Sequence, residues 1–310
     1  MRQFFFWFVL FLIAAFWGGA FAAIKFILRF ISPTELLVYR FMPTAIICIL
    51  AALVFYRRDS LALFKKYWVV LITISILWLF GYHLTLNIGE TVLPAGPAGL
   101  IIGTYPIFTI FLAPFFIREK LTPGKLIGGI IGFIGTAFLM IQGAQHEGAV
   151  LNIEPSKWIL YGLITLIAPV SAAVHTIIAK PYLTGENRDG VRMDPIQMNI
   201  LYMAPAVVFL VPFILTGPSR SLMEFPASFW IALGFLVIFC TLGAYIGWLW
   251  AVAKLGAGRV AVTAYVIPLF SLAFARIWLG EPIGMPTIVG AVCIIVGVIF
   301  ANAGGKLNGD

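Results

Sequence analysis

Charged residues are scarce in this chain, and their scarcity excludes an ordinary soluble domain. Lys, Arg, Asp and Glu make up 10% of the 310 residues, and hydrophobic residues make up 62%. Soluble domains have about 25% charged and about 45–50% apolar residues. The composition therefore predicts an integral membrane protein. The net charge of +8 does not call for a nucleic-acid partner, because membrane topology accounts for most of it.

Patterns that bind metals, nucleotides or disulfide partners are also missing. Cys48, Cys240 and Cys293 lie in separate apolar runs without paired spacing, so they predict neither a disulfide framework nor a metal site. The chain has no HExxH, Walker A or GxSxG motif and no pair of acids at depth that suits a metal. We therefore expect no catalytic residues, no cofactor and no metal, and we interpret the chain as something other than an enzyme.

Long apolar runs fill the chain instead. Ten of them are long enough to cross the hydrocarbon core as helices, so the sequence predicts an all-α membrane fold with ten transmembrane helices. The runs are Phe5–Ile24, Glu35–Phe55, Trp68–Ile88, Ala95–Phe116, Gly124–Ile141, Lys157–Ile178, Pro195–Leu215, Ser228–Val252, Ala257–Leu279 and Met285–Ala303.

The basic residues predict the orientation of these helices. With the N-terminus inside, most Lys and Arg between the runs fall on inner segments, as at Arg57-Arg58 and Lys65-Lys66. This positive-inside pattern predicts a multi-pass protein of the inner or plasma membrane with both termini in the cytoplasm, and the basic segments match anionic lipid. The first run ends in Ala20-Phe21-Ala22 and resembles a cleavable signal peptide. We expect an uncleaved helix, because this run has a counterpart at the start of the second half.

Much of the sequence of the first half is repeated in the second half. The segments Leu93–Met140 and Leu255–Asn302 match at a constant offset, including Pro106 with Pro268 and Glu119 with Glu281. Because each half holds five helices, an odd number, the two halves enter the membrane with opposite orientation. We expect a first repeat at 1–143, a linker loop at 144–156, a second repeat at 157–305 and a cytoplasmic tail at 306–310. The charged loop at 181–194 is expected to be a mobile hinge.

At these motifs the chain resembles the EamA type of the drug/metabolite transporter superfamily. The resemblance rests on three features: Phe16-Trp17-Gly18-Gly19 followed by Lys25; Ser32-Pro33 before Tyr39-Arg40-Phe41; and the twice-written proline-to-glutamate segment. It implies a carrier with ten helices in two inverted five-helix repeats, a central cavity, and export of amino acids or other small metabolites. One departure is Ala172, which stands where the family often has a tryptophan near the start of the first helix of the second half.

Polar residues inside apolar runs are the default site candidates, because they are costly in a membrane. His83, Asn87 and Glu90 share one helical face. His83 is interpreted either as a substrate-binding or titrating group or as a neutral histidine bonded to a neighbouring helix. Glu90 is expected to be a solvated acid near the outer end. Arg40 is expected to form a structural ion pair rather than to bind substrate.

Aromatic residues and helix-breaking prolines complete the candidate set. A stripe of aromatics in a membrane helix is either core or cavity wall, and a paired proline break predicts a gate. The Gly128-x-x-x-Gly132 motif predicts close helix packing, with dimerisation as the alternative. The predicted substrate-binding residues are Trp17, Trp78, Tyr82, His83, Asn87, Tyr105, His175, Tyr245, Trp248, Thr263 and Tyr265, with Pro106 and Pro268 as gating or hinge residues.

The sequence thus predicts a secondary transporter that exports small metabolites, most of all amino acids and related amphipathic compounds, by alternating access. Its expected partners are a small-molecule substrate and membrane lipids, and it is expected to be a monomer or homodimer. Drugs, phosphorylated metabolites or nucleotide sugars are alternative substrates, and an intramembrane enzyme acting on lipid is the alternative class. Proton coupling through His83 or His175 and uncoupled exchange are both open.

Overall fold

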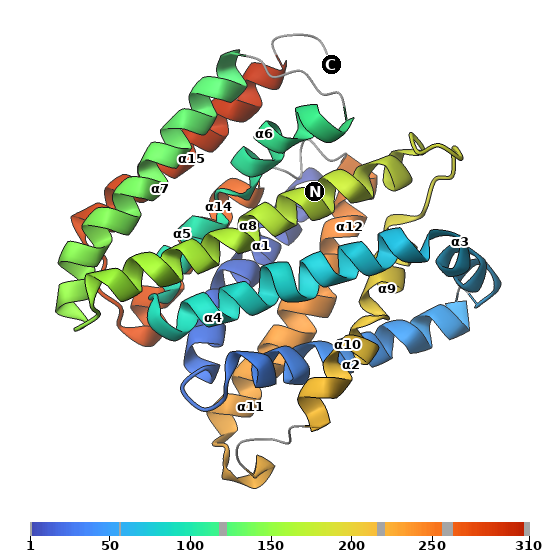
Figure 1. Cartoon of the computed structure of the whole chain (residues 1–310), viewed down its shortest axis with the longest axis horizontal. Helices are drawn as coiled ribbons and strands as arrows, with labels where there is room; N and C mark the ends of the chain where they lie inside the picture. The colour runs from blue at the N-terminus through green and yellow to red at the C-terminus, as the bar shows by residue number, and fades with distance from the viewer. Residues whose placement is uncertain (1, 56, 118–122, 216–220, 256–262, 307–310) are drawn as a thin grey trace.

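The protein is all-helical within the part described by the computed structural model, which covers residues 2–55, 57–117, 123–215, 221–255 and 263–306 (Figure 1). Eight helical segments are long and apolar enough to cross a membrane, and two shorter apolar helices lie at Val266–Leu279 and Met285–Phe300. Together these segments correspond to the ten runs read from the sequence. The predicted all-α membrane fold is confirmed.

The first half contains five spans, two of which are built from several pieces. A long third span joins two α-helices through a π-helix, and the fourth span is broken after Ile102. The elements are α1 (Arg2–Ile27), α2 (Pro33–Phe55), α3 (Arg57–Ile76), η1 (Leu77–Leu84), α4 (Thr85–Val92), α5 (Ala95–Ile102), α6 (Tyr105–Ile117) and α7 (Pro123–Val150).

The second half follows the same order, and its third span also contains a π-helix. The elements are α8 (Pro155–Thr184), α9 (Pro195–Met203), α10 (Ala206–Leu215), the 3-10 turn η2 (Leu222–Glu224), α11 (Ala227–Gly234), η3 (Phe235–Gly243), α12 (Ala244–Leu255), α14 (Thr263–Leu279) and α15 (Met285–Lys306).

Several helices begin at residues that satisfy their free backbone amides. The hydroxyl of Ser32 accepts a bond from the Glu35 amide at 3.2 Å, and the Glu35 carboxylate accepts one from the Ser32 amide at 2.8 Å. This reciprocal pair is a capping box at the start of α2. Asp194 Oδ1 accepts bonds from the amides of Ile196 and Gln197 at 3.0 and 3.1 Å, which starts α9.

The connection between the halves is much shorter than the loop expected at 144–156. Helix α7 continues through Val150 and α8 begins at Pro155, so only residues 151–154 lie outside helices. The buried Trp158 ring of α8 packs closely against Gly143 of α7, since a Cβ added to Gly143 would lie 3.1 Å from the ring. The Ile153 amide donates to the Gly148 carbonyl at 2.7 Å. These contacts hold a tight corner, which the polar composition alone did not predict.

The two halves interlock through pairs of helices from opposite repeats. Helices α7 and α15 lie side by side along one edge of the molecule (Figure 1). In the same way α1 packs against α14, α8 against α6 and α4, and α2 against α9 and α10. The core therefore forms between repeats, and neither five-helix half is a separate globule.

Glycines permit the closest of these approaches. A Cβ added to Gly297 of α15 would lie 2.6 Å from both the Gly128 carbonyl oxygen and the Gly132 nitrogen of α7. The Gly128-x-x-x-Gly132 face is thus used for packing inside the chain, as the sequence predicted. A second copy of the chain is not needed to explain it.

The first prediction concerns this contact. We expect Gly297→Ala to lower the thermal unfolding temperature in detergent, because the added methyl meets backbone and such overpacking costs ~1–3 kcal/mol. Gly234→Ala is the matched control, since a Cβ there meets nothing within 4 Å. Equal unfolding temperatures for the two variants would contradict the packing of α7 on α15.

Candidate functional site

The third span of each half contains a π-helix, and these two irregular segments face the middle of the molecule. Trp78, Tyr82 and His83 come from η1, whereas Cys240 and Thr241 come from η3. A π-helical turn widens the helix and displaces carbonyl groups from their regular partners, and such turns are frequent at functional sites. Neither π-helix is predicted by the apolar pattern of the sequence.

Trp78 is the centre of an aromatic cluster that draws on both repeats. Its ring stacks on Tyr82 with centroids 4.8 Å apart and an interplanar angle of 5°. The same ring lies 5.0 Å from His83, 5.1 Å from His175 of α8 and 5.5 Å from Tyr245 of α12. His83 and His175, from opposite halves, therefore contact the same indole.

Trp17 of α1 extends this cluster on the other side of Tyr245. Its ring lies 5.5 Å from Tyr245 and 5.3 Å from Trp248, and its Nε1 donates to the Cys240 carbonyl at 3.0 Å. Trp17 is therefore held inside the protein rather than at the membrane interface. We call the connected set the aromatic cluster: Trp17, Trp78, Tyr82, His83, His175, Tyr245 and Trp248.

Arg40 of α2 is buried beside this cluster. Its Nε donates to Thr241 Oγ1 at 2.9 Å, and that hydroxyl donates to the Leu236 carbonyl at 2.8 Å, five residues back in η3. Its guanidinium lies 5.2 Å from the centre of the Phe41 ring. In place of the expected ion pair, Arg40 binds a hydroxyl of the second π-helix through its Nε and lies beside the Phe41 ring. The expectation of a structural ion pair is therefore wrong.

Several buried polar atoms in and near the cluster have no hydrogen-bond partner among the described residues. They are Trp78 Nε1, both ring nitrogens of His83, His175 Nε2 and Asn199 Oδ1. A buried polar group without a partner costs about 1–3 kcal/mol. The interpretation of His83 as a residue bonded to a neighbouring helix is therefore wrong for this structure, and its nitrogens are available to a polar ligand.

A cavity of about 550 Å³ adjoins the cluster. Its walls come from α2, α9, η3 and α12, and its polar lining comprises Thr44, Asn199, Thr241 and Tyr245. Tyr245 belongs both to this wall and to the aromatic cluster, so the two features are continuous. The volume falls in the range of about 300–1,000 Å³ that small-molecule sites occupy.

The remaining candidate residues lie elsewhere. Asn87 donates to the Pro33 carbonyl at 3.2 Å, at the start of α2, and Tyr105 begins α6. Thr263 and Tyr265 lie at the start of α14, but their side chains are outside the described part of the structure.

The two prolines predicted as a symmetric gate differ in their surroundings. In the first half the helix is interrupted at Gly103 and Thr104, and Pro106 is the second residue of α6. In the second half α14 runs without interruption through Pro268. The expected pair of equal breaks is therefore wrong, because only the first-half position is broken. The two positions meet in space, since a Cβ on Gly103 would lie 2.9 Å from Pro268 Cγ.

Glu90 is fully buried, contrary to the expectation of a solvated acid. Neither carboxyl oxygen has a hydrogen-bond partner among the described residues. Lys25 of α1 donates instead to the backbone carbonyl of Glu90 at 2.7 Å and lies 3.5 and 3.4 Å from the carbonyls of Thr91 and Val92. Lys25 thus caps the C-terminus of α4.

Glu281 closes the same end of the molecule from the other half. Its carboxylate accepts bonds from the backbone amides of Ala95 and Gly96 at 2.9 and 3.2 Å, at the N-terminus of α5. Burial raises the pKa of Glu281 above its ordinary value, and the two amides oppose that rise. The carboxylate links the loop before α15 to α5, and hence one repeat to the other.

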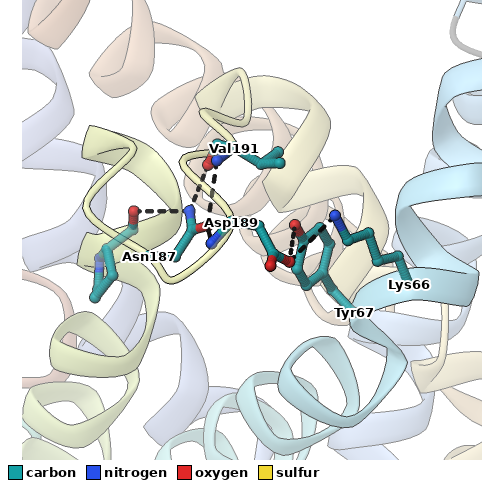
Figure 2. A network of polar contacts seen from close by, with 6 residues as sticks. Lys66, Tyr67, Asn187, Asp189 and Val191 are labelled. Carbon is teal, nitrogen blue, oxygen red and sulfur yellow. Dashed lines mark hydrogen bonds and ion pairs between the residues drawn. The ribbon is translucent and has the colours of Figure 1, made fainter.

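Far from Glu90 on the same span, the middle of α3 is linked to the second repeat by an exposed polar network (Figure 2). Asp189 Oδ2 lies 3.1 Å from Lys66 Nζ and accepts a bond from the Tyr67 hydroxyl at 2.9 Å. Asn187 shapes the loop by accepting bonds from the amides of Asp189 and Val191 at 3.1 and 3.2 Å. The loop expected as a mobile hinge is therefore tied to α3.

Comparison with known proteins identifies relatives over nearly the whole chain. The EamA-like transporter family matches residues 5–141 and 156–303. An uncharacterized transporter of Archaeoglobus fulgidus is 33% identical over 296 residues, covering 94% of this chain and 96% of the relative. A probable terminal-alkyne amino-acid exporter of Streptantibioticus cattleyicolor is 27% identical over 221 residues, covering 71% of this chain and 68% of the relative.

A solved crystal structure has the same fold. It aligns with a TM-score of 0.61 at 16% identity and covers 96% of this chain and 97% of its own. At this identity the likeness concerns the arrangement of the helices alone.

The second prediction concerns the network in Figure 2. The Tyr67 hydroxyl, followed by Lys66, holds the pKa of Asp189 below its ordinary value, so the network contributes at neutral pH and is lost as the pH falls through that lowered pKa. We expect Asp189→Asn to speed tryptic cleavage at Arg188 and Arg192 by a few-fold at pH 8, a modest effect because exposed ion pairs are weak. Cleavage of detergent-purified protein is followed by mass spectrometry. Glu186→Gln, in the same loop, is the control, and identical rates for the two variants would refute the tie.

Proposed function

Because the chain belongs to the EamA-like transporter family, we propose that it is a secondary transporter that exports small metabolites, most of all amino acids and related amphipathic compounds. It is a multi-pass membrane protein, and we place it in the inner or plasma membrane with both termini in the cytoplasm. The relative named as an amino-acid exporter supports this substrate class. The observation that carries the proposal is the aromatic cluster beside a cavity of about 550 Å³ at the junction of the two repeats.

Each part of this site matches one part of an amphipathic amino acid. The faces of Trp78, Tyr82 and Tyr245 suit an apolar or aromatic side chain. The guanidinium of Arg40 suits a carboxylate, and the unpartnered nitrogens of His83 and His175 suit further polar groups. Asn87, Tyr105, Thr263 and Tyr265 stay predicted site residues, and Pro106 and Pro268 stay predicted hinge residues.

Transport in this proposal is alternating access between two repeats that share one site. We take 1–143 and 157–305 as the repeats, joined by 144–156 and followed by a tail at 306–310. The Glu281 contact closes one end and the Asp189 network ties the other. Movement of the repeats would break the contact at one end of the molecule while the contact at the other end is kept. The aromatic cluster would then open to one side at a time. Packing of the Gly128-x-x-x-Gly132 face inside the chain supports a monomer as the transport unit.

Phosphorylated or nucleotide-sugar substrates fit the cluster less well. A multiply anionic group calls for several Arg or Lys donors, and Arg40 is the cation bound at the cluster. Drugs with aromatic rings remain compatible with the aromatic walls. An enzyme acting on lipid is distinguished by experiment, because it would convert its substrate in detergent, whereas a carrier needs a sealed bilayer.

The third prediction tests the site. Cells that express the chain and are challenged with toxic amino-acid analogues should gain resistance, and Trp78→Ala should abolish it. Loss of a central aromatic anchor costs ~2 kcal/mol, which is about thirty-fold in affinity, measurable as the half-saturation concentration for radiolabelled amino acids in proteoliposome counterflow. His83→Ala should weaken export as well.

Trp68→Ala is the matched control, because Trp68 lies on the same long span but is 54% exposed on its outside. Resistance that is equal for Trp78→Ala and Trp68→Ala would remove the aromatic cluster as the site. Absence of counterflow by the wild-type protein for every amino acid tried would remove the proposed substrate class.

A further inference from the structure

Three carboxylates are buried in the described part of the chain, and two of them have clear structural partners. Glu147 is 3% exposed and accepts bonds from the Gly284 amide at 2.7 Å and the Thr287 hydroxyl at 2.5 Å. Glu281 is 9% exposed and accepts the Ala95 and Gly96 amides. Glu90 is 0% exposed, and neither of its oxygens has a partner. Glu90 therefore requires another explanation.

The charged groups around Glu90 do not supply that partner. Lys25 of α1 directs its ammonium to the backbone carbonyls at the end of α4, and Arg40 of α2 directs its Nε to Thr241. Glu281, from the loop after α14, adds a like charge, and Tyr82 of η1 is the other titratable group nearby. Of the other described elements packed here, α8 places the uncharged Thr165 against Gly89, and α5 has no titratable residue.

A carboxylate in this position is unstable as an anion. An ionised group buried without a partner costs many kcal/mol, and such groups take up a proton instead. Glu90 is thus a neutral carboxylic acid while this end of the protein is closed. Once water reaches it, the anion can be solvated, and the carboxyl group then exchanges its proton with that water.

The contacts that close this end lie within a few residues of Glu90. Lys25 binds the last carbonyls of α4, and Glu281 binds the first amides of α5. Separation of these contacts would expose Glu90 to outer water and release Lys25 to act as its counter-ion. Opening of the outer end therefore gives the Glu90 carboxyl group access to protons of the outer water.

The same helical face leads from Glu90 toward the aromatic cluster. Asn87 is one turn before Glu90, and His83 is one turn further. Asn87 Oδ1 and both nitrogens of His83 lack partners among the described residues, as do the Glu90 oxygens. This face is a line of polar atoms that connects the outer end to the substrate site.

We propose that Glu90 is the proton-binding site that couples export to a proton gradient. The inference rests on the proposed transport function. In the outward-open state a proton from outer water forms an O–H bond with the Glu90 carboxylate. In the inward-open state that bond breaks, and the proton passes to water that reaches Glu90 from the inner side along the polar face of Asn87 and His83. One proton moves inward across the membrane in each transport cycle, and no other reactant is consumed. The role assigned to the two histidines in the sequence analysis thus moves to Glu90.

The first test measures the proton site without a substrate. Dicyclohexylcarbodiimide is apolar and reacts with protonated carboxyl groups in the membrane, so it should modify Glu90 in the purified protein, less as the pH rises, as shown by peptide mass spectrometry. A water-soluble carbodiimide should leave Glu90 unmodified. Glu147, buried but hydrogen-bonded, is the internal control. Absence of modification of Glu90 at every pH, or modification that ignores pH, would overturn the proposal.

The second test, the fourth prediction, measures coupling. Proteoliposomes are loaded with a mixture of radiolabelled proteinogenic amino acids, and counterflow without a gradient is compared with accumulation under an imposed pH gradient. We expect Glu90→Gln to keep counterflow. We expect its gradient-driven accumulation to be at least about ten-fold lower than that of the wild type, because its neutral amide cannot release a proton. Glu147→Gln should keep the response to the gradient.

The outcomes separate the two proposals. Absence of counterflow in the wild type refutes amino-acid transport, and the carbodiimide test still decides whether Glu90 binds a proton. Counterflow in the wild type with a full gradient response in Glu90→Gln refutes the role of Glu90. If Glu90→Gln does not fold, Glu90→Asp takes its place, since it keeps a carboxylic acid and should keep the gradient response with a shifted pH profile. A pH profile unchanged in Glu90→Asp would count against the proposal.

Discussion

The backbone of a membrane protein must find its hydrogen-bond partners inside the protein, because lipid offers none. In this chain several irregular parts of the backbone are satisfied by side chains from the opposite repeat. Trp17 binds the Cys240 carbonyl of η3, Glu281 binds the first amides of α5, and Glu147 binds the amide before α15. The polar residues that fill this structural role are therefore also the residues that join the two halves.

This constraint divides the buried polar residues into two groups. Those with backbone partners, such as Lys25, Glu147 and Glu281, stabilise helix ends. Those with buried side-chain atoms that have no partner among the described residues, such as both nitrogens of His83, Nε2 of His175 and the Glu90 oxygens, lie around the aromatic cluster or on the helical face that leads to it. Because each unpartnered group lowers stability, a chain retains such a group only where it does something else. Apart from Ser60 Oγ of α3, the buried unpartnered side-chain atoms of the described residues lie in or beside the site or on that helical face.

The helices were predictable because apolar run length is a local property, and the aromatic cluster was largely predictable because large aromatics gather at helix interfaces. The partners of individual residues were not. Glu90 is buried at an end where Lys25 and Glu281, both distant in sequence, bind the neighbouring backbone, and Arg40 meets a hydroxyl of the other repeat rather than an acid. The π-helices have no recognisable composition, since they arise where a helix adjusts to its neighbours. The unequal surroundings of Pro106 and Pro268 have the same origin.

Duplication of the sequence does not make the two halves equal in structure. The π-helix of the second half is bound by Trp17 and Arg40, whereas the π-helix of the first half presents Trp78 and His83 with free polar atoms. One fourth span is broken at Gly103, and the position related to it lies within the continuous helix α14. In the alternating-access cycle that we propose, two related repeats share one site and differ locally in each state. The local differences between the repeats then correspond to one state of that cycle, and the opposite state would exchange the roles of the two halves.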